Sequence, residues 1–553
     1  MIGPDARIAL TISLLGLASC TLAQEREQLP IFRVSPAPMD AAAVEALGAA
    51  LQIGGDLELT PADDRFRLVR GRKAAEIYTA SGGVWAADEA RLWNPALRPE
   101  LPDDGEARRI ADAFLRPQSA RLFPPDDPAS LRFANLAGTR LARLNARTGM
   151  REDRQLDVQV NYVATLSVAG QDGTVREFPI VGGGGEFNVV LGDRRSIIGY
   201  SGVWRPIEGV AFESPVIPRV QADEQFRELT SGLDVTAFEA EIAYYAAPAW
   251  VEQSLLYPVY VYRAFAQIEG ERVPLRIILL PATEFGPRAQ PQTILPLRTQ
   301  RDLPLRRAMP GEGEGPREAG ASWIGLSGGL SGSEANAQGF VDGLEQDGWA
   351  INFNWGDWNA WESDWRWNDD TWVDAADFVF YAGHASMDGW LLRDPDDDSL
   401  SFAEVGVEPE YPGDLWGQDL EWLVIAAGGP LQDEVLSPGG GNVFDRWSGA
   451  FDRLHLLLGY GAGTYDNAEE GDQLVTAATD GKRLIDAWFR AARETQPGTN
   501  GYPAPDGPTV YVGAMYVESS RARSPAADHL HRRGPVASDP VDPDVYVAMW
   551  SPT

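Results

Sequence analysis

The chain has 553 residues, with 47 basic and 81 acidic side chains, four histidines and one cysteine. Its net charge of −34 at pH 7 excludes nucleic acid as an expected partner, because a phosphate backbone binds a basic surface. A single cysteine excludes disulfide bonds within the chain and metal sites built from several cysteines. The composition is that of an ordinary globular protein, and the length predicts roughly two to four domains.

The first 23 residues predict a lipoprotein-type signal peptide. An apolar run from Ile8 to Leu17 follows Arg7 and is too short to span a bilayer, which needs about 20 residues. The run ends in Leu17-Ala18-Ser19-Cys20, which resembles the bacterial lipobox. The resemblance implies that Cys20 is lipidated and that a lipid anchor holds the protein in the cell envelope, at the outer membrane or surface if the cell has an outer membrane. Ordinary secretory cleavage after Ala23, which gives a secreted or periplasmic protein, is the alternative.

Residues 24–206 and 207–295 predict α+β modules in which helices precede sets of alternating strands. The expected helices are at 40–47, 106–115 and 222–229. The stretches VQVNYVATLSV and FPIVGGGGEFNVVL and the helix ARRIADAFL resemble PepSY domains and the propeptide modules of thermolysin- and fungalysin-type metalloproteases. The resemblance implies a non-catalytic role in binding, inhibition or chaperoning. A generic helix-on-sheet spacer is the alternative.

Residues 296–320 are rich in Pro, Arg, Gly and Glu and predict a linker. Residues 321–553 then predict a separate α/β domain, with one long helix at 472–495. Its short, continuous apolar runs are typical of parallel strands covered by helices on both faces, with ligands at the carboxyl ends of the strands. The expected fold class is therefore multidomain α+β followed by α/β.

Two of these strands end in recognisable residues. The strand DFVFYAGHAS ends in Gly383-His384, and the following LEWLVIAAGG ends where Ala427 meets Gly428. This order resembles the caspase-like fold of clan CD cysteine peptidases, of the gingipain and CHAT type, and an uncharacterised bacterial family of this fold. The resemblance assigns the catalytic histidine position to His384 and the position of the catalytic cysteine to Gly428. Both residues should lie at the ends of adjacent parallel strands and face one cleft.

The glycine at position 428 decides the expected chemistry. A thiolate is the nucleophile of clan CD peptidases, and glycine has no side chain, so thiol peptidase activity is not available. We therefore expect a degenerate, non-catalytic domain that binds a peptide, a glycan or an envelope protein. The residues expected to bind this ligand lie at the strand ends: Gly383, Ser386, Asp388 and Gly429.

A hydrolase is the alternative function. Gly325–Gly329 fits the G-x-S-x-G elbow, with Ser327 as nucleophile. Its partners would be His384 or His455 and Asp374 or Asp377. The helix expected from Ser333 begins later than an elbow requires. A third hypothesis is a purely structural envelope protein.

No metal or other cofactor is expected. His455 opens an apolar strand and is typical of a buried core residue. The pair His529 and His531 lies in an Arg-rich loop, and H-x-H alone is weak evidence for zinc. A calcium loop is the weak alternative, at Asp394, Asp396 and Asp398, but Ser399 and Val405 occupy the EF-hand glycine and glutamate positions.

Six tryptophans lie between positions 355 and 372, interleaved with acidic residues. Each indole ring can bury about 150–250 Å², so most of these rings are expected to pack over the sheet. One or two are expected to line the cleft.

We predict that Cys20→Ser removes acyl labelling and shifts the protein out of the envelope fraction, because the thiol is the only group that can carry the lipid. Metabolic labelling with a fatty acid and cell fractionation measure both effects. Recovery of an unlabelled wild-type protein that begins at Gln24 would contradict the prediction.

Overall fold

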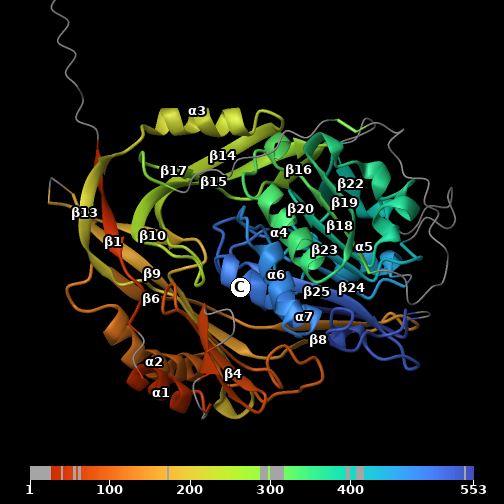
Figure 1. Ribbon diagram of the computed structural model, residues 1–553, viewed down its shortest axis with the longest axis horizontal. Coiled ribbons are helices and arrows are strands. Elements are labelled where there is room, and N and C mark those ends of the chain that lie inside the picture. The colour runs from red at the N-terminus through yellow and green to blue at the C-terminus, as the bar shows by residue number, and fades with distance from the viewer. Residues whose placement is uncertain are drawn as a thin grey trace, which may run out of the picture.

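The computed structural model describes residues 27–38, 41–53, 58–59, 64–170, 173–286, 297–298, 317–393, 399–405, 416–451, 453–540 and 543–553. Cys20, the three aspartates 394, 396 and 398, and most of the expected linker lie outside these ranges. Within them, the chain is sheet-rich and is organised around two large mixed sheets (Figure 1). No helix of the described part has the length and apolar character to cross a bilayer.

The first sheet contains fifteen strands among the described residues, in the order β13-β1-β15-β14-β10-β9-β11-β12-β5-β4-β3-β2, with β6, β16 and β17 off this path. Its strands are β1 (Gln28–Val34), β2 (Glu58–Leu59), β3 (Arg65–Arg70), β4 (Lys73–Tyr78), β5 (Val84–Asp88), β6 (Ala129–Ala137), β9 (Val158–Ala169), β10 (Val175–Val181), β11 (Glu186–Leu191), β12 (Ile197–Gly202), β13 (Ile207–Pro215), β14 (Asp234–Tyr245), β15 (Leu255–Ile268), β16 (Glu271–Pro274) and β17 (Ile278–Pro281).

Three helices pack on this sheet, close to the positions that the sequence predicts: α1 (Ala41–Ala50), α2 (Asp104–Leu122) and α3 (Arg219–Leu229). The Asp103 side chain caps α2 by accepting a hydrogen bond from the Glu106 amide at 2.8 Å. Ala107, Ala111 and Leu115 then follow at helical spacing and are buried against the strands. These modules have the expected helix-on-sheet form.

The second sheet has nine strands in the described part, in the order β19-β18-β20-β23-β24-β25-β26-β7-β8. Their bounds are β19 (Ala350–Gly356), β18 (Glu318–Trp323), β20 (Phe378–Ala382), β23 (Trp422–Ala426), β24 (Leu456–Tyr460), β25 (Tyr511–Glu518), β26 (Val545–Pro552), β7 (Arg140–Asn145) and β8 (Arg151–Gln155). The pairs from β19 to β24 are parallel, and those from β24 to β8 are antiparallel.

Helices and turns cover the two faces of this sheet. One face packs against α4 (Ser333–Gln346), α6 (Glu470–Thr479) and α7 (Leu484–Thr495). The other packs against α5 (Val443–Trp447), tryptophan-rich turns and the small hairpin of β21 (Gly389–Leu391) and β22 (Ser399–Ser401). The single helix expected at 472–495 is wrong, because the chain breaks at residues 480–483, where Gly481 adopts a φ of +83°.

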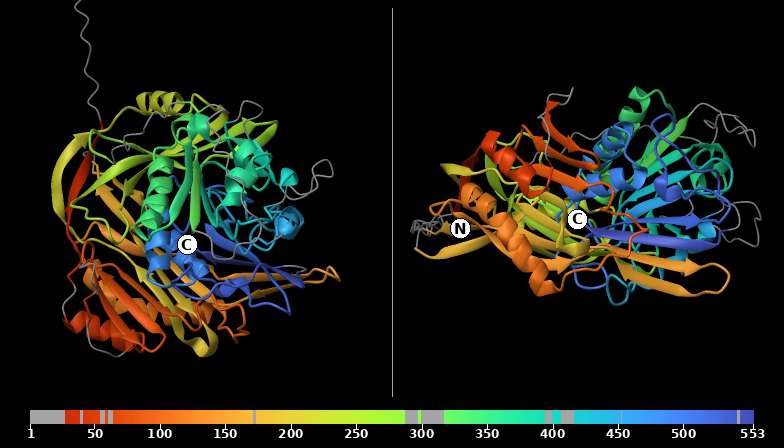
Figure 2. Two further views of the ribbon diagram at one scale, coloured as in Figure 1. Left: turned by 45° about the vertical axis from the view of Figure 1, so that its right-hand side comes forward. Right: turned by 90° about the horizontal axis from the view of Figure 1, so that it is seen from below.

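The second sheet also recruits a hairpin from the first half of the chain. β7 and β8 come from residues 140–155, and β7 pairs with β26 over six residue pairs. Figure 2 shows this hairpin beside the C-terminal strands and away from the rest of its own module. A β sheet therefore crosses the boundary that the sequence places at residues 296–320.

Helix α7 lies between the two sheets and is buried along almost its whole length. Arg490 of α7 donates to Glu76 of β4 and to the Tyr78 hydroxyl, both at 2.6 Å. Glu494 of the same helix accepts from Tyr78 at 2.7 Å. Burial alone would raise the pKa of Glu76, but the adjacent Arg490 charge holds that pKa well below its ordinary value. This network joins the two halves of the chain.

We predict that Arg490→Ala lowers the free energy of unfolding by about 3–5 kcal/mol, because it leaves the Glu76 carboxylate buried without its main partner. Chemical denaturation measures the change. Arg483→Ala is the matched control at the N-terminal end of the same helix. The side chains of Arg483 and its partner Asp486 are 23% and 20% exposed, so a loss of about 1 kcal/mol is expected. Equal losses in the two variants would contradict the role given to Arg490.

Candidate functional site

The strand ends of the second sheet bring the expected site residues together. β20 and β23 are adjacent and parallel, and Ala382 pairs with Ala426. His384 and Gly428 each lie two residues beyond this pair and therefore occupy equivalent positions at the carboxyl edge. This part of the sequence-based prediction is confirmed.

The open cleft expected around His384 is wrong, because the side chain has no exposed surface. Its Nδ1 accepts a hydrogen bond from the Arg276 amide at 3.0 Å, and its Nε2 lies 2.8 Å from the Gly328 carbonyl, to which it donates. Burial lowers the pKa of His384 to about 4. The ring is therefore neutral, and neither nitrogen is free to take a proton from a substrate.

The segment that seals His384 comes from the first half of the chain, between β16 and β17. Ile277 forms a parallel bridge with Tyr465, just beyond the end of β24. Its amide donates to the Thr464 carbonyl at 2.8 Å, and its carbonyl accepts from the Asp466 amide at 2.9 Å. The main chain of this segment is thus bound as a short extra strand.

The side chain of Arg276 enters the second sheet at the same place and is 2% exposed. Its guanidinium donates to the Ala426 carbonyl at 2.8 Å and to the Tyr465 carbonyl at 2.5 and 3.1 Å. Its Nη2 lies 3.6 Å from Oε2 of the fully buried Glu470. Neither Arg276 nor Glu470 is among the site residues that the sequence predicts, although an arginine within the apolar run VPLRIILL requires a buried partner.

The remaining strand-end residues surround this contact. A Cβ on Gly428 would lie 2.9 Å from Cα of Gly463, and a Cβ on Gly383 would overlap the Tyr381 hydroxyl at 2.1 Å. Gly429 has a φ of +95°. The buried Ser386 hydroxyl accepts from the amide of the exposed Asp388 at 3.0 Å, so its acceptor is used locally.

The structure does not assemble the alternative serine site. The Ser327 hydroxyl and amide both donate to Oδ1 of Asp357, at 2.8 and 2.9 Å. Asp357 also accepts from the amides of Gly325 and Leu326, so it caps the turn that would be the elbow. Asp374 accepts amide hydrogen bonds near the other end of β20, away from His384. Helix α4 begins at Ser333, as expected.

The tryptophan-rich segment divides between core and surface. Trp365 and Trp372 are buried in the core beneath the sheet, as expected for most rings. Trp358 and Trp367 are 58% and 42% exposed, and arginines lie over both rings. The buried Trp365 ring packs edge-to-face against Tyr381 of β20.

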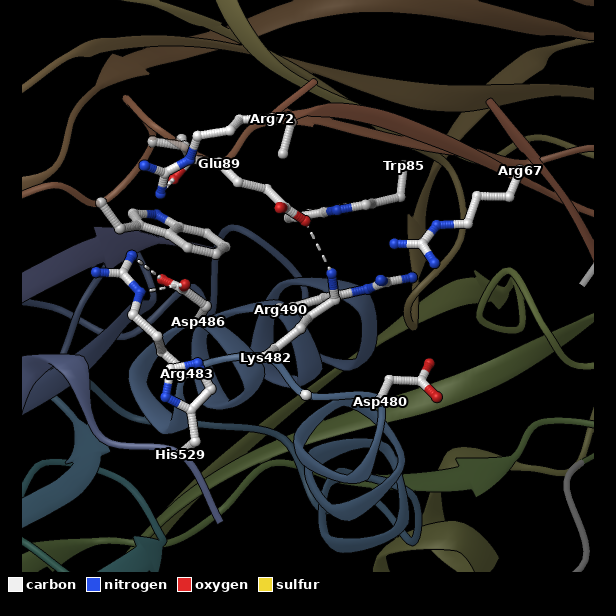
Figure 3. Close-up of a pocket in the computed structure, with 14 residues that line it drawn as sticks. Arg67, Arg72, Trp85, Glu89, Asp480, Lys482, Arg483, Asp486, Arg490 and His529 are labelled. Carbon is white, nitrogen blue, oxygen red and sulfur yellow. Dashed lines mark hydrogen bonds and ion pairs between the residues drawn. The ribbon is translucent and has the colours of Figure 1, made fainter. Parts of the chain in front are cut away.

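A separate cavity of about 290 Å³ lies between β3 to β5 and the start of α7 (Figure 3). Two of its basic side chains are paired with acids in the wall: Lys482 lies 3.2 Å from Glu89, and Arg483 binds Asp486 at 2.7 Å. In all, five basic and three acidic side chains line the cavity. His529 contributes to the wall. None of the site residues that the sequence predicts lines this cavity, so the strand-end site is the candidate on which sequence and structure agree.

Residues 320–552 match the family model described as "Domain of unknown function (DUF6345)". No curated protein matches the chain. A crystal structure of an uncharacterized protein from Eubacterium rectale ATCC 33656 is similar over 46% of this chain and 85% of that chain, with 10% identity and a TM-score of 0.24.

We predict that acidification destabilises the protein through His384. In the unfolded state His384 is protonated below about pH 6.5, whereas in the folded state it is protonated only below about pH 4. The free energy of unfolding therefore decreases as the pH falls from 6.5 to 4. The contribution is roughly 3 kcal/mol. The measurement compares unfolding free energies of the wild type and His384→Gln between pH 7 and 4. The difference should shrink or reverse on acidification, and parallel profiles would contradict the prediction.

Proposed function

We propose that the protein is a cell-envelope lipoprotein whose C-terminal domain binds an extended, arginine-bearing peptide and does not hydrolyse it. The observation that carries this proposal is the burial of Arg276. Its guanidinium lies among two main-chain carbonyls and the Glu470 carboxylate of the second half of the chain. In this chain the protein's own segment occupies the site. A partner peptide would compete with that segment for the same groups.

The groups around Arg276 support recognition of both main chain and side chain. The carbonyl of Thr464 and the amide of Asp466 bind the main chain, as in peptide recognition by strand addition. The carbonyls of Ala426 and Tyr465 and the Glu470 carboxylate suit a guanidinium, which presents several donors in one plane. A lysine, with a compact ammonium group, would not satisfy all three acceptors.

The caspase-like assignment belongs to this proposal. It is supported by the parallel neighbours β20 and β23 and by the equivalent positions of His384 and Gly428. The proposal excludes thiol chemistry because position 428 has no side chain. It also excludes general base catalysis by His384 in the sealed state, because both ring nitrogens are hydrogen-bonded to main-chain groups.

The first half of the chain acts in this proposal as an internal inhibitor of binding. Its segment at 275–277 closes the site, which agrees with the inhibitory role that a propeptide-like module would have. The lipid anchor at Cys20 would place the site at a membrane surface. The anchor is proposed from the sequence alone.

We predict that a peptide of residues 271–281 binds the Arg276→Ala chain at least 10-fold more tightly than it binds the wild type. In the wild type the tethered segment competes at an effective concentration of about millimolar or higher. Fluorescence anisotropy of a labelled peptide measures the affinity.

The matched control is Arg205→Ala, because Arg205 is buried to a similar degree but is held by the Ala247 and Pro248 carbonyls, which belong to the same half of the chain. This variant should not bind the peptide. A second control is the peptide that carries alanine in place of Arg276. Equal affinity for the arginine and alanine peptides would contradict the proposal.

A structural envelope protein is the second candidate, and the observation that favours it is the complete burial of His384 and near-complete burial of Arg276. In that case no peptide binds either variant, and Arg276→Ala only destabilises the protein. Screening for peptide and ester hydrolysis, with Ser327→Ala and His384→Ala as comparisons, tests the hydrolase alternative.

A further inference from the structure

A second polar cluster lies at the amino edge of the same sheet, opposite the strand ends described above. Asp377, Glu421 and His455 each directly precede one of three adjacent parallel strands, β20, β23 and β24. The first residues of these strands, Phe378, Trp422 and Leu456, are paired in register. Residues one position earlier therefore form a row across the sheet, with their side chains on one side.

The segment that follows β25 completes the cluster with His531 and Asp539. The potential ligand atoms of Glu421, His455 and Asp539 all lie within 4.8 Å of one another, and so do those of Asp377, Glu421 and His531. Glu421 belongs to both groups. His531 Nε2 lies 2.7 Å from Glu421, and His455 Nε2 lies 3.6 Å from Asp539.

A contact with Asp528 fixes the orientation of the His455 ring. Its Nδ1 lies 2.7 Å from the fully buried Asp528 carboxylate. Asp528 also accepts hydrogen bonds from the Trp422 indole and the Ala537 amide. Both carboxylate oxygens therefore act as acceptors, and the one beside the His455 ring accepts from Nδ1. In the neutral ring the hydrogen is therefore on Nδ1, and Nε2 carries the lone pair. Burial alone would lower the pKa of His455, but hydrogen bonds to Asp528 and Asp539 raise it to about 9, so a bound cation would displace the proton on Nε2. This arrangement of carboxylate and histidine is typical of metal ligands.

The Nε2 atom of His455 is buried and has no hydrogen-bond partner among the residues that the structure describes. It points toward Glu421 and Asp539, as the distances above require. A buried lone pair that faces two carboxylates is costly unless a cation or a proton lies between them. The Asp539 side chain is 49% exposed, so an ion can reach this place from solvent.

We propose that this cluster binds one divalent transition-metal ion of the zinc class, through His455 Nε2 and the carboxylates of Glu421 and Asp539. Zinc binds histidine nitrogen and carboxylate oxygen at about 2.0–2.2 Å, so its tetrahedral ligand atoms lie about 3.4 Å apart. The 3.6 Å separation of His455 and Asp539 is close to this value. Water would complete the coordination, and His531 would position Glu421.

The test uses the full-length chain with Cys20→Ser, so that no thiol competes for the metal. After treatment with a chelator, zinc alone is titrated by calorimetry and cobalt alone by absorption spectroscopy. We expect one equivalent of each ion to bind, and cobalt to give the visible absorption of a low-coordinate site. Asp539→Asn should weaken binding by at least 10-fold, because it removes a charged ligand and the loss of an outer-shell partner alone typically costs roughly 10–100-fold. His455→Gln should remove the cobalt spectrum.

The matched control is His529→Gln, because His529 is near in sequence but its Nδ1 contacts the Ala527 carbonyl, outside the cluster. This variant should bind as the parent does. Asp539→Asn changes an exposed side chain, so its result does not depend on whether His455→Gln folds. Failure to bind zinc and cobalt, or binding that neither Asp539→Asn nor His455→Gln weakens, would overturn the proposal. The first result would mean that a proton on His455 balances the carboxylates.

Discussion

Buried arginines join the two halves of this molecule, and the need to compensate their charge governs how the halves fit. Arg490 comes from the second half and is paired with Glu76 of the first. Arg276 comes from the first half and enters a site that contains Glu470 of the second. An unpaired buried charge costs several kcal/mol. Each half therefore supplies a carboxylate that compensates a buried arginine of the other half. The two sheets therefore form one structure, although each has its own core.

The parallel part of the second sheet gives the molecule two polar edges with different environments. Strand β20 has five residues, so its first and last Cα atoms are about 13 Å apart. At the carboxyl edge, Arg276 fills the space and His384 is sealed. At the amino edge, Asp539 and His531 remain partly exposed beside the buried His455. Among the residues that the structure describes, the partly exposed Asp539 and His531 open the amino edge to an ion from solvent, whereas His384 is sealed at the carboxyl edge.

Sequence patterns predict where the strands of this protein lie better than they predict which strands pair with each other. Continuous apolar runs identify β20, β23 and β24, because such strands are buried on both faces. The same patterns place His384 and Gly428 correctly, since both follow strands that pair in register. The hairpin β7–β8 is not predictable in this way, because alternation identifies a strand but does not say which sheet it joins. The row of Asp377, Glu421 and His455 was missed because its members are 44 and 34 residues apart and meet only through strand register.

The glycine at position 428 and the occupant of the site are physically linked. Because Gly428 has no side chain, its main chain approaches Gly463, and a Cβ would be 2.9 Å from the Gly463 Cα. This approach fixes the turn that leads to Thr464 and Tyr465, whose carbonyls bind Ile277 and Arg276. A cysteine at 428 would push the turn away and move these acceptors. The residue that removes thiol chemistry therefore also shapes the place where the arginine binds.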